Sequence, residues 1–345
     1  MVAALAYAAA AAAVLGSGSR FGLSNATRTA VLAVPLIVVC ASAACAVDPA
    51  DRPPYSLKDG TPPVAVPAAV TNPLDEIAYR LEHPDQVLFV DRTSADADRW
   101  PLVVLDRFDG VNWTSSAEYR QLGSRLAPDP AVRVPTIRRD ARIAIAGLRG
   151  PWLPSQHRLE SATGVRPLVD EASGGLLYEQ VATGLSYQLR WSSPRLAGKE
   201  LANAAVDSTA TGGTEGLGTV PASVIDLATV AVHGLRPSFQ AALLLEQYLR
   251  QHYRLASGDN LPTGHGWPQI AHFLDPRNTR GGTAEQFAAA YVALARTLGI
   301  PARLVVGFRQ PSQPEPDGSY VVRNADASAW PEVAVEGFGW VRSTR

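Results

Sequence analysis

The pattern over residues 281–341 constrains the fold most, because one amphipathic helix is followed there by several strands. Thr283, followed three residues later by Gln286, has the form of a capping box and predicts a helix that begins near Ala284. Gly299 predicts where that helix ends. Apolar residues spaced at helical intervals mark one buried face of it: Phe287, Tyr291, Leu294 and Leu298.

Strands are predicted on both sides of this helix in the sequence. After it, strands are expected at 303–308, 320–322, 330–335 and 340–341. Before it, short apolar runs separated by turn signals predict a small antiparallel β domain over 76–195. Four tryptophans are expected in the core or rim of that domain rather than on a binding surface: Trp100, Trp113, Trp152 and Trp191.

The N-terminal region is predicted to contain transmembrane helices. Residues 30–47 form an uncharged run of 18 residues, which meets the lower limit for a membrane span. Residues 1–16 are apolar but shorter, and are expected to be part of a helix. The loop between them carries Arg20 and Arg28 and no acidic residue, which indicates a cytoplasmic loop. Residues after about 47 are therefore expected to be extracytoplasmic, at the cell membrane.

Two alternatives for this region were weighed. A cleaved signal peptide would use Arg28 as its basic start and Ala43 as the end of its cleavage motif, but a long stretch precedes Arg28. Lipidation of Cys45 is not favoured, because Ser42 stands where a large aliphatic residue is expected. With Cys40 as the only other cysteine, the chain has neither a disulfide framework nor a Cys-rich zinc site.

The expected organisation is therefore α+β. It consists of the transmembrane region 1–47, an extended linker 48–75, the β-rich domain 76–195, a second linker 196–235 and a final domain 236–345. A net charge of −1 gives no support for nucleic-acid binding, and no nucleic-acid partner is expected.

The final domain resembles the transglutaminase-like superfamily, in particular its bacterial membrane-anchored branch. The segments that carry the resemblance are 286–288, 294–296, 298–303, 307–308, 326–333 and 339–341. The resemblance implies a papain-like core in which a helix packs on an antiparallel sheet. A weaker resemblance upstream, at 107–110, 113 and 152–154, implies the β domain of that branch.

The resemblance also implies a catalytic triad, and here the sequence departs from it. In the family, a Cys at the helix start attacks an amide, a His moves the proton and an Asp orients the His. The corresponding positions in this chain are Ala284, Ser328 and Thr344. A hydroxyl such as that of Ser328 needs a base of its own to act as a nucleophile. The three roles are therefore predicted to be vacant.

Two functions follow as hypotheses. The first is a non-catalytic binding or scaffolding module at the cell envelope, whose partner is a peptide, an envelope polymer or another membrane protein. The alternative is an amidase or protease that recruited Glu285, His265 or Ser328. The residues expected to line the cleft are His265, Trp267, Glu285, Asp326 and Trp330. No cofactor is expected, nor a metal at His265, His272 and Glu285, since a close-spaced ligand pair is missing.

The ends of the sequence suggest a gene fragment as a third reading. The sequence begins within an apolar stretch and stops where the last strand of the core should be completing. Members of the branch usually continue into another transmembrane helix and a small cytoplasmic domain. We therefore expect the last domain to be incomplete at its C-terminus.

Overall fold

The computed structural model describes most of the chain that follows the N-terminal region. The described residues are 63–64, 72–93, 97–123, 125–179, 181–195, 200–201, 203–256, 261–278 and 281–342. They belong to one compact unit, Pro62–Arg345. The spans predicted at 1–16 and 30–47, and Thr344, lie outside the described residues. Among the residues that are described, the longest and most apolar helices fall short of what a membrane span requires.

Helix α8 (Ala284–Thr297) is the central helix, and its predicted start is confirmed. The Thr283 side chain accepts a hydrogen bond from the Gln286 N–H, and Gly299 takes the left-handed conformation (φ +73°) just past the end of the helix. Nearly all of α8 is buried, because its residues on every face of the helix are shielded from solvent by neighbouring elements. It packs against α5, α6, α7 and the strands β12 and β14.

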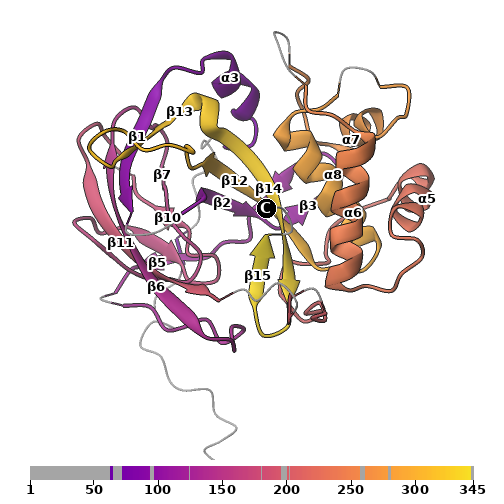
Figure 1. Cartoon of the computed structure of the whole chain (residues 1–345), viewed down its shortest axis with the longest axis horizontal. Helices are drawn as coiled ribbons and strands as arrows, with labels where there is room; N and C mark the ends of the chain where they lie inside the picture. The colour runs from indigo at the N-terminus through magenta and orange to yellow at the C-terminus, as the bar shows by residue number, and fades with distance from the viewer. Residues whose placement is uncertain are drawn as a thin grey trace, which may run out of the picture. The chain divides into compact units, whose positions relative to one another are not determined.

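The other helices surround α8 or cap the sheets: α3 (Ile77–Glu82), α5 (Ala222–Ala231), α6 (Phe239–His252) and α7 (Trp267–Phe273). Ser238 caps α6 by accepting a hydrogen bond from the Ala241 N–H at 3.1 Å. In Figure 1, α5 to α8 gather on one side of β14. Helix α5 lies within 196–235, where we expected a linker. Its sequence is rich in Ala and Val and gives only a weak helical period.

The sheet beneath α8 has the antiparallel order β15 (Gly339–Arg342), β14 (Ala327–Val335), β12 (Ala302–Arg309) and β2 (Arg99–Leu105). This arrangement confirms the expected helix packed on an antiparallel sheet. The close approach of β12 and β2 requires glycine at position 307. A Cβ there would lie only 2.1 Å from the carbonyl oxygen of Trp100.

The β-rich region contains two further sheets and a short hairpin. Their strands are β1 (Val87–Thr93), β3 (Arg107–Phe108), β4 (Trp113–Thr114), β5 (Tyr119–Gln121), β6 (Thr136–Ile145), β7 (Trp152–Leu153), β8 (Leu159–Thr163), β9 (Leu168–Asp170), β10 (Leu176–Leu177), β11 (Ser186–Pro194) and β13 (Tyr320–Arg323). The sheet orders are β13-β1-β6-β11-β8 and β5-β9-β10-β7, and β3 pairs with β4. All four tryptophans named above are buried, as predicted.

Two strands cross the domain boundary that the sequence suggested. Strand β2 comes from the β-rich region but pairs with β12 in the sheet beneath α8. Strand β13 comes from the last part of the chain but pairs with β1. The regions 76–195 and 236–345 therefore share strands within one compact unit, because β12 and β1 each complete their hydrogen bonding with a strand that is distant in sequence.

The buried guanidinium of Arg296 ties α8 to three other segments. Its Nε donates to the carbonyl of Ala302 at 2.8 Å, and Nη1 donates to that of Glu215 at 2.6 Å. Its Nη2 donates to the carbonyls of Asp106 and Gly212, both at 2.8 Å. Burial lowers the Arg296 pKa to about 10, although the charges of Asp106 and Glu215 act in the opposite direction.

Arg296→Met is expected to lower the free energy of unfolding by about 3 kcal/mol or more, because several buried carbonyls lose their donor at once. Urea denaturation measures the change. The matched control is Arg250→Met, whose exposed side chain pairs with Glu246 at 3.1 Å and whose loss should cost less than about 1 kcal/mol. Equal losses in the two variants would contradict the role given to Arg296.

Asp91 on β1 is a fully buried carboxyl. Its Oδ1 accepts from Gln310 Nε2 at 3.2 Å, and Oδ2 has no hydrogen-bond partner among the described residues. Burial raises the Asp91 pKa from 3.8 to about 7, while hydrogen bonds from Gln310 and Trp100 lower it by less. The folded state thus binds more protons than the unfolded state between these two values, so this group's contribution to stability falls as the pH rises through that window.

Asp91→Asn should remove this pH dependence. Relative to the parent protein, the variant should gain stability between pH 5 and pH 8 by more than about 1 kcal/mol, because the parent must bury a charge at the higher pH. Urea denaturation at both pH values checks this, with Asp226→Asn as the control for loss of an exposed carboxyl. A difference that stays constant with pH would show that Asp91 is not the group responsible.

Candidate functional site

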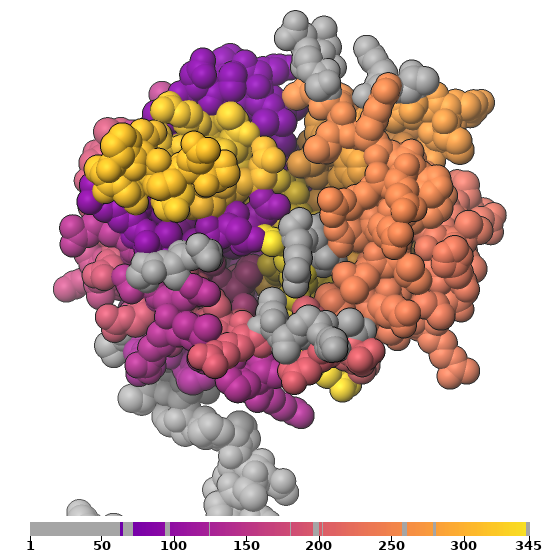
Figure 2. Space-filling model, in the orientation of Figure 1, coloured from indigo at the N-terminus to yellow at the C-terminus, as the bar shows by residue number. Residues whose placement is uncertain are grey.

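A pocket of about 590 Å³ lies where the start of α8 faces β14 and α6. Figure 2 shows the surface hollowed between the helices drawn in orange and the C-terminal residues drawn in yellow. Its helical wall includes Leu249, Tyr253, Thr283, Ala284, Phe287 and Tyr291. Its sheet wall includes Arg99, Arg309, Ala327, Ser328, Ala329, Trp330 and Pro331. A concave, mostly apolar site with a few polar groups is typical of ligand binding.

The first turn of α8 is held by a buried histidine–carboxylate contact. Glu285 is 2% exposed, and its Oε1 lies 2.8 Å from Nδ1 of His265, which is 6% exposed. Gln286 Nε2 also donates to the carbonyl of Gly264, at 3.3 Å. An acidic residue in the first turn is favourable at the positive end of the helix dipole. The pair therefore fixes the loop before α7 to the helix start, and leaves Ala284 at the pocket wall.

Ser328 on β14 lines the same pocket as Ala284. Its hydroxyl makes only a long contact, 3.4 Å, with the carbonyl of Ala329. Histidine is not found among the described residues that line the pocket, and the acid there, Glu246, is paired with Arg250. Ser328 thus has no base beside it that could activate its hydroxyl.

Of the five residues expected to line the cleft, Trp330 does so and the other four do not. His265 and Glu285 face each other within the protein. The Trp267 indole donates to the carbonyl of Leu217 at 3.0 Å and packs edge-on against Phe108. These residues come before the start of α8 or within its first turn, and none of them is in the pocket lining.

Asp326 also differs from expectation. It lies in the 3-10 turn η3 (Asn324–Asp326), where its carboxylate accepts from the Arg323 N–H at 2.9 Å. Burial raises the Asp326 pKa above its ordinary value, although the charges of Arg309 and Arg323 and that hydrogen bond act against the rise. It therefore caps a turn rather than facing a ligand. Of the candidate catalytic positions that the structure describes, Ala284 and Ser328 are the two that line the pocket.

Sequence reasoning missed the arginines of the pocket. Arg99 begins β2 and Arg309 ends β12, and each looked like the ordinary polar flank of an apolar strand. It also missed the contribution of α6, since the apolar face of that helix signals only burial. Their meeting depends on the pairing of β2 with β12, which the local pattern of either strand does not predict.

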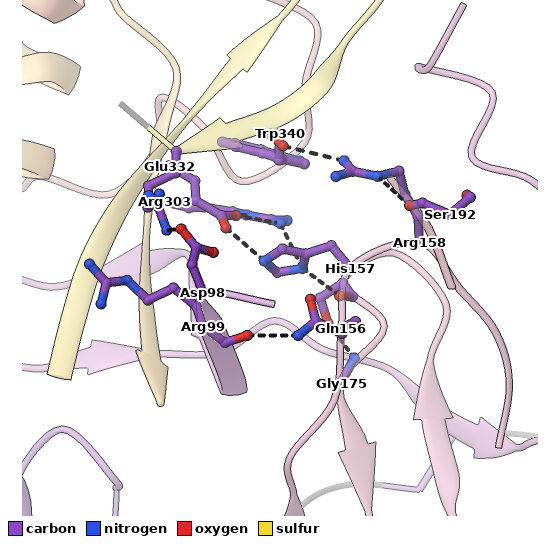
Figure 3. Close-up of polar contacts among 12 residues, drawn as sticks. Asp98, Arg99, Gln156, His157, Arg158, Gly175, Ser192, Arg303, Glu332 and Trp340 are labelled. Carbon is purple, nitrogen blue, oxygen red and sulfur yellow. Dashed lines mark hydrogen bonds and ion pairs between the residues drawn. The ribbon is translucent and has the colours of Figure 1, made fainter. Parts of the chain in front are cut away.

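A buried polar cluster supports β14 further along the strand (Figure 3). Glu332 Oε1 lies 2.7 Å from Nε2 of His157, and its Oε2 lies 2.9 Å from Nε of Arg303. His157 Nδ1 lies 2.8 Å from the carbonyl oxygen of Ser173. The Arg303 guanidinium stacks 4.2 Å from the centroid of the Trp340 ring. No nucleophilic side chain hydrogen-bonds to His157 among the described residues, so this cluster is structural.

His157 and Arg303 stabilise the ionised form of Glu332. Burial raises its pKa, but the positive charges of His157 and Arg303 and their hydrogen bonds lower it by more, so the Glu332 pKa lies well below its ordinary value of 4.5. The folded-state pKa is depressed. The stabilisation by this carboxylate is therefore present above about pH 4.5 and is lost as the pH falls below it.

Glu332→Gln should lower the free energy of unfolding by about 3 kcal/mol at pH 7, because Arg303 is left buried without its carboxylate. The loss should shrink at pH 3, because the unfolded parent protein takes up a proton at this carboxyl below about pH 4.5, while the folded parent keeps it charged. Urea denaturation at the two pH values measures both effects. The control is Glu336→Gln, which changes an exposed carboxylate at the end of the same strand. A loss that is equal at both pH values would contradict this account.

Metal binding has no support in the described part of the chain, where no three His, Cys, Asp or Glu side chains are grouped for it. His265 and Glu285 are close, but His272 lies on α7 and does not join them.

Two solved structures share this fold. The crystal structure of the periplasmic domain of TgpA from Pseudomonas aeruginosa bound to ethylmercury is 21% identical in sequence, with a TM-score of 0.53. The alignment covers 78% of this chain and 92% of that one. The same periplasmic domain without that ligand gives a TM-score of 0.52 at 21% identity, over 81% and 93% of the two chains. A search among curated proteins finds no match.

Two family models match the sequence in succession. The TgpA N-terminal domain model matches residues 1–197, which is more than half of the chain. The transglutaminase-like superfamily model matches residues 225–344, the part that contains α8 and the sheet beneath it. The chain therefore belongs to the TgpA N-terminal domain family and carries a transglutaminase-like core.

Proposed function

We propose that this protein is a membrane-anchored, extracytoplasmic and non-catalytic member of its family, which binds a peptide in the pocket between α8 and β14. The observation that carries the proposal is that Ala284 and Ser328 both line that pocket. These are the positions at which the resemblance implies a nucleophilic Cys and a His. The pocket itself is retained, with an open volume and an aromatic wall, so binding does not depend on the missing chemistry.

The alternative, an amidase or protease with a replaced catalytic set, has less support. It requires Ser328 to meet a base, yet His265 pairs with Glu285 away from the pocket lining. His157, the other buried histidine with a carboxylate partner, contacts Glu332 and a backbone carbonyl. Neither histidine is hydrogen-bonded to a hydroxyl, which is the arrangement that activates a serine.

The extracytoplasmic location rests on two separate lines of support. The structure from Pseudomonas aeruginosa is described as a periplasmic domain, and it covers most of the chain studied here. The basic loop between the two apolar N-terminal runs also favours a cytoplasmic loop followed by an external domain. The membrane anchor remains a proposal from the sequence, since those residues are outside the described part.

The purified full chain is expected to release no ammonia from a glutamine-containing peptide in the presence of an amine acceptor, because neither Cys nor His is among the described residues that line the pocket. It should also leave casein uncleaved. The control is Ser328→Ala, which should give the same background rate as the parent protein. A parental rate that exceeds this background and is lost in Ser328→Ala would overturn the non-catalytic assignment in favour of the alternative.

Ala284→Cys tests the geometry directly. A thiol at the start of α8 should have a pKa below the ordinary value of about 8.5, because the helix dipole stabilises the thiolate. Adding Ser328→His should lower the thiol pKa further, since the two side chains face the same pocket. The measurement is the pH dependence of alkylation by iodoacetamide, in a background that carries Cys40→Ser and Cys45→Ser.

The control for this experiment is Thr297→Cys, at the opposite end of α8, where the dipole disfavours a thiolate. If the thiol at position 284 titrates no lower than the one at position 297, and Ser328→His has no effect on it, then the two positions do not form the vacated site that the proposal requires.

A further inference from the structure

Two arginines stand directly opposite one another at one end of the pocket. In the antiparallel pairing of β2 with β12, Arg99 is the register partner of Arg309. On β12, Arg309 is two residues beyond Gly307, which is the partner of Ser328 on β14. The three side chains therefore start from the same face of the sheet. Like charges directly opposite each other destabilise a sheet, so this pair calls for a compensating charge.

Among the described residues, Asp98 is close enough for its charge to act on Arg99, but its ion pair is with Arg342 and not with Arg99. Its guanidinium lies over the Trp330 ring, 5.4 Å from the centroid, and its Nε is buried without a hydrogen-bond partner. In Figure 3 its backbone carbonyl is bound to Gln156, while the guanidinium extends away from the His157 cluster. Burial, and then the charge of Arg342, lower the Arg99 pKa to about 10; the charge of Asp98 acts in the opposite direction, and that of Arg309 lowers the pKa by a smaller amount.

The nearby carboxylates are engaged elsewhere. Asp98 is ion-paired with Arg342, and Asp326 accepts the Arg323 N–H. Arg309 makes one long contact, 3.4 Å from Nη2 to the carbonyl oxygen of Ala325. Neither carboxylate forms an ion pair with Arg99 or Arg309 among the described residues. This end of the pocket is therefore positively charged. Some of its guanidinium N–H donors, such as Arg99 Nε, have no hydrogen-bond acceptor among the described residues.

The rest of the pocket favours a peptide as the occupant. Its helical wall presents Leu249, Phe287 and Tyr291, and its sheet wall presents the Trp330 ring. Of the hydroxyls that line it, those of Tyr253 and Tyr291 donate to backbone carbonyls and that of Thr283 caps α8. A sugar polymer rich in hydroxyls would need many hydrogen-bond partners that are still available. Apolar peptide side chains can fill such a space without that requirement.

We propose that the pocket recognises a peptide segment with an acidic side chain, whose carboxylate is bound by Arg99 and Arg309 together. Guanidinium groups bind carboxylates through paired, charge-assisted hydrogen bonds. The bound carboxylate would use donors that are now unpaired and would relieve the repulsion between the two arginines. The inference rests on the proposed function, since it names the ligand class of the same pocket.

The test uses two fluorescent mixtures of short peptides, acetylated and amidated at their ends. One has Glu and the other Gln at the central position, with uncharged residues elsewhere. The only difference between the two mixtures is that the central side chain ends in a carboxylate in one and in an amide in the other. Fluorescence anisotropy with the full chain should show about tenfold tighter binding of the Glu mixture. That preference should shrink as sodium chloride is added, because salt screens the charge interaction.

Arg309→Gln and Arg99→Gln should each remove most of the preference for the Glu mixture while leaving binding of the Gln mixture nearly unchanged. Arg309 is exposed, so its replacement should keep the fold even if that of Arg99 does not. The matched control is Arg142→Gln, which removes the same charge from the exposed face of β6, away from the pocket, and should keep the preference.

The outcomes distinguish a failure of the carboxylate inference from a failure of the proposed peptide-binding function. Equal binding of the two mixtures, or a preference that survives in both pocket variants, would overturn the carboxylate inference while leaving peptide binding in place. Failure of both mixtures to bind would overturn the proposed peptide-binding function, and the inference with it. A preference lost equally in Arg142→Gln would show that net charge alone causes it, which also overturns the inference.

Discussion

The buried Arg296 guanidinium is the constraint on which the rest of this structure depends. It donates from the last turn of α8 to backbone carbonyls of β12, of the residue that follows β2 and of the segment near Gly212. It also stacks 5.4 Å from the centroid of the Trp113 ring. A buried charge is tolerated only when its donors are satisfied, so these segments must all be in place together. The position of α8 over the sheet, and thus of the pocket at its other end, follows from this contact.

The pocket is consequently assembled from parts of the chain that are far apart in sequence. Arg99 comes from the β-rich region, the aromatic wall from α6 and α8, and Ser328 from β14. In a fold of this kind, the residues that support the site are different from the residues that face it. Buried pairs such as His265–Glu285 and His157–Glu332 support the walls, and none of these four residues lines the pocket. Small side chains at positions 284 and 328 are compatible with an intact scaffold for this reason.

Local features of the fold could be predicted from the sequence, and long-range ones could not. The Thr283 cap, the Gly299 stop and the apolar stripe between them define α8, because each acts within a few residues of the backbone it controls. Strand pairing is different, since the pattern of β2 predicts a buried strand but not its partner. The same limit applies to His265 and Glu285, which pair with each other outside the pocket lining, whereas Trp330 lies in that lining. Their buried pairing depends on how two loops meet.

The exchange of β2 and β13 between the two halves also affects the order in which the chain can fold. Asp91 on β1 pairs with Tyr320 on β13, and Val104 on β2 pairs with Val305 on β12. As synthesis proceeds from the N-terminus, β1 and β2 each have an edge that stays unpaired until β13 and β12 have been synthesised. Pairings between such distant residues are slow to form, and waiting edges are open to association with other chains. The protein is therefore expected to depend on protection of its early strands before the chain is complete.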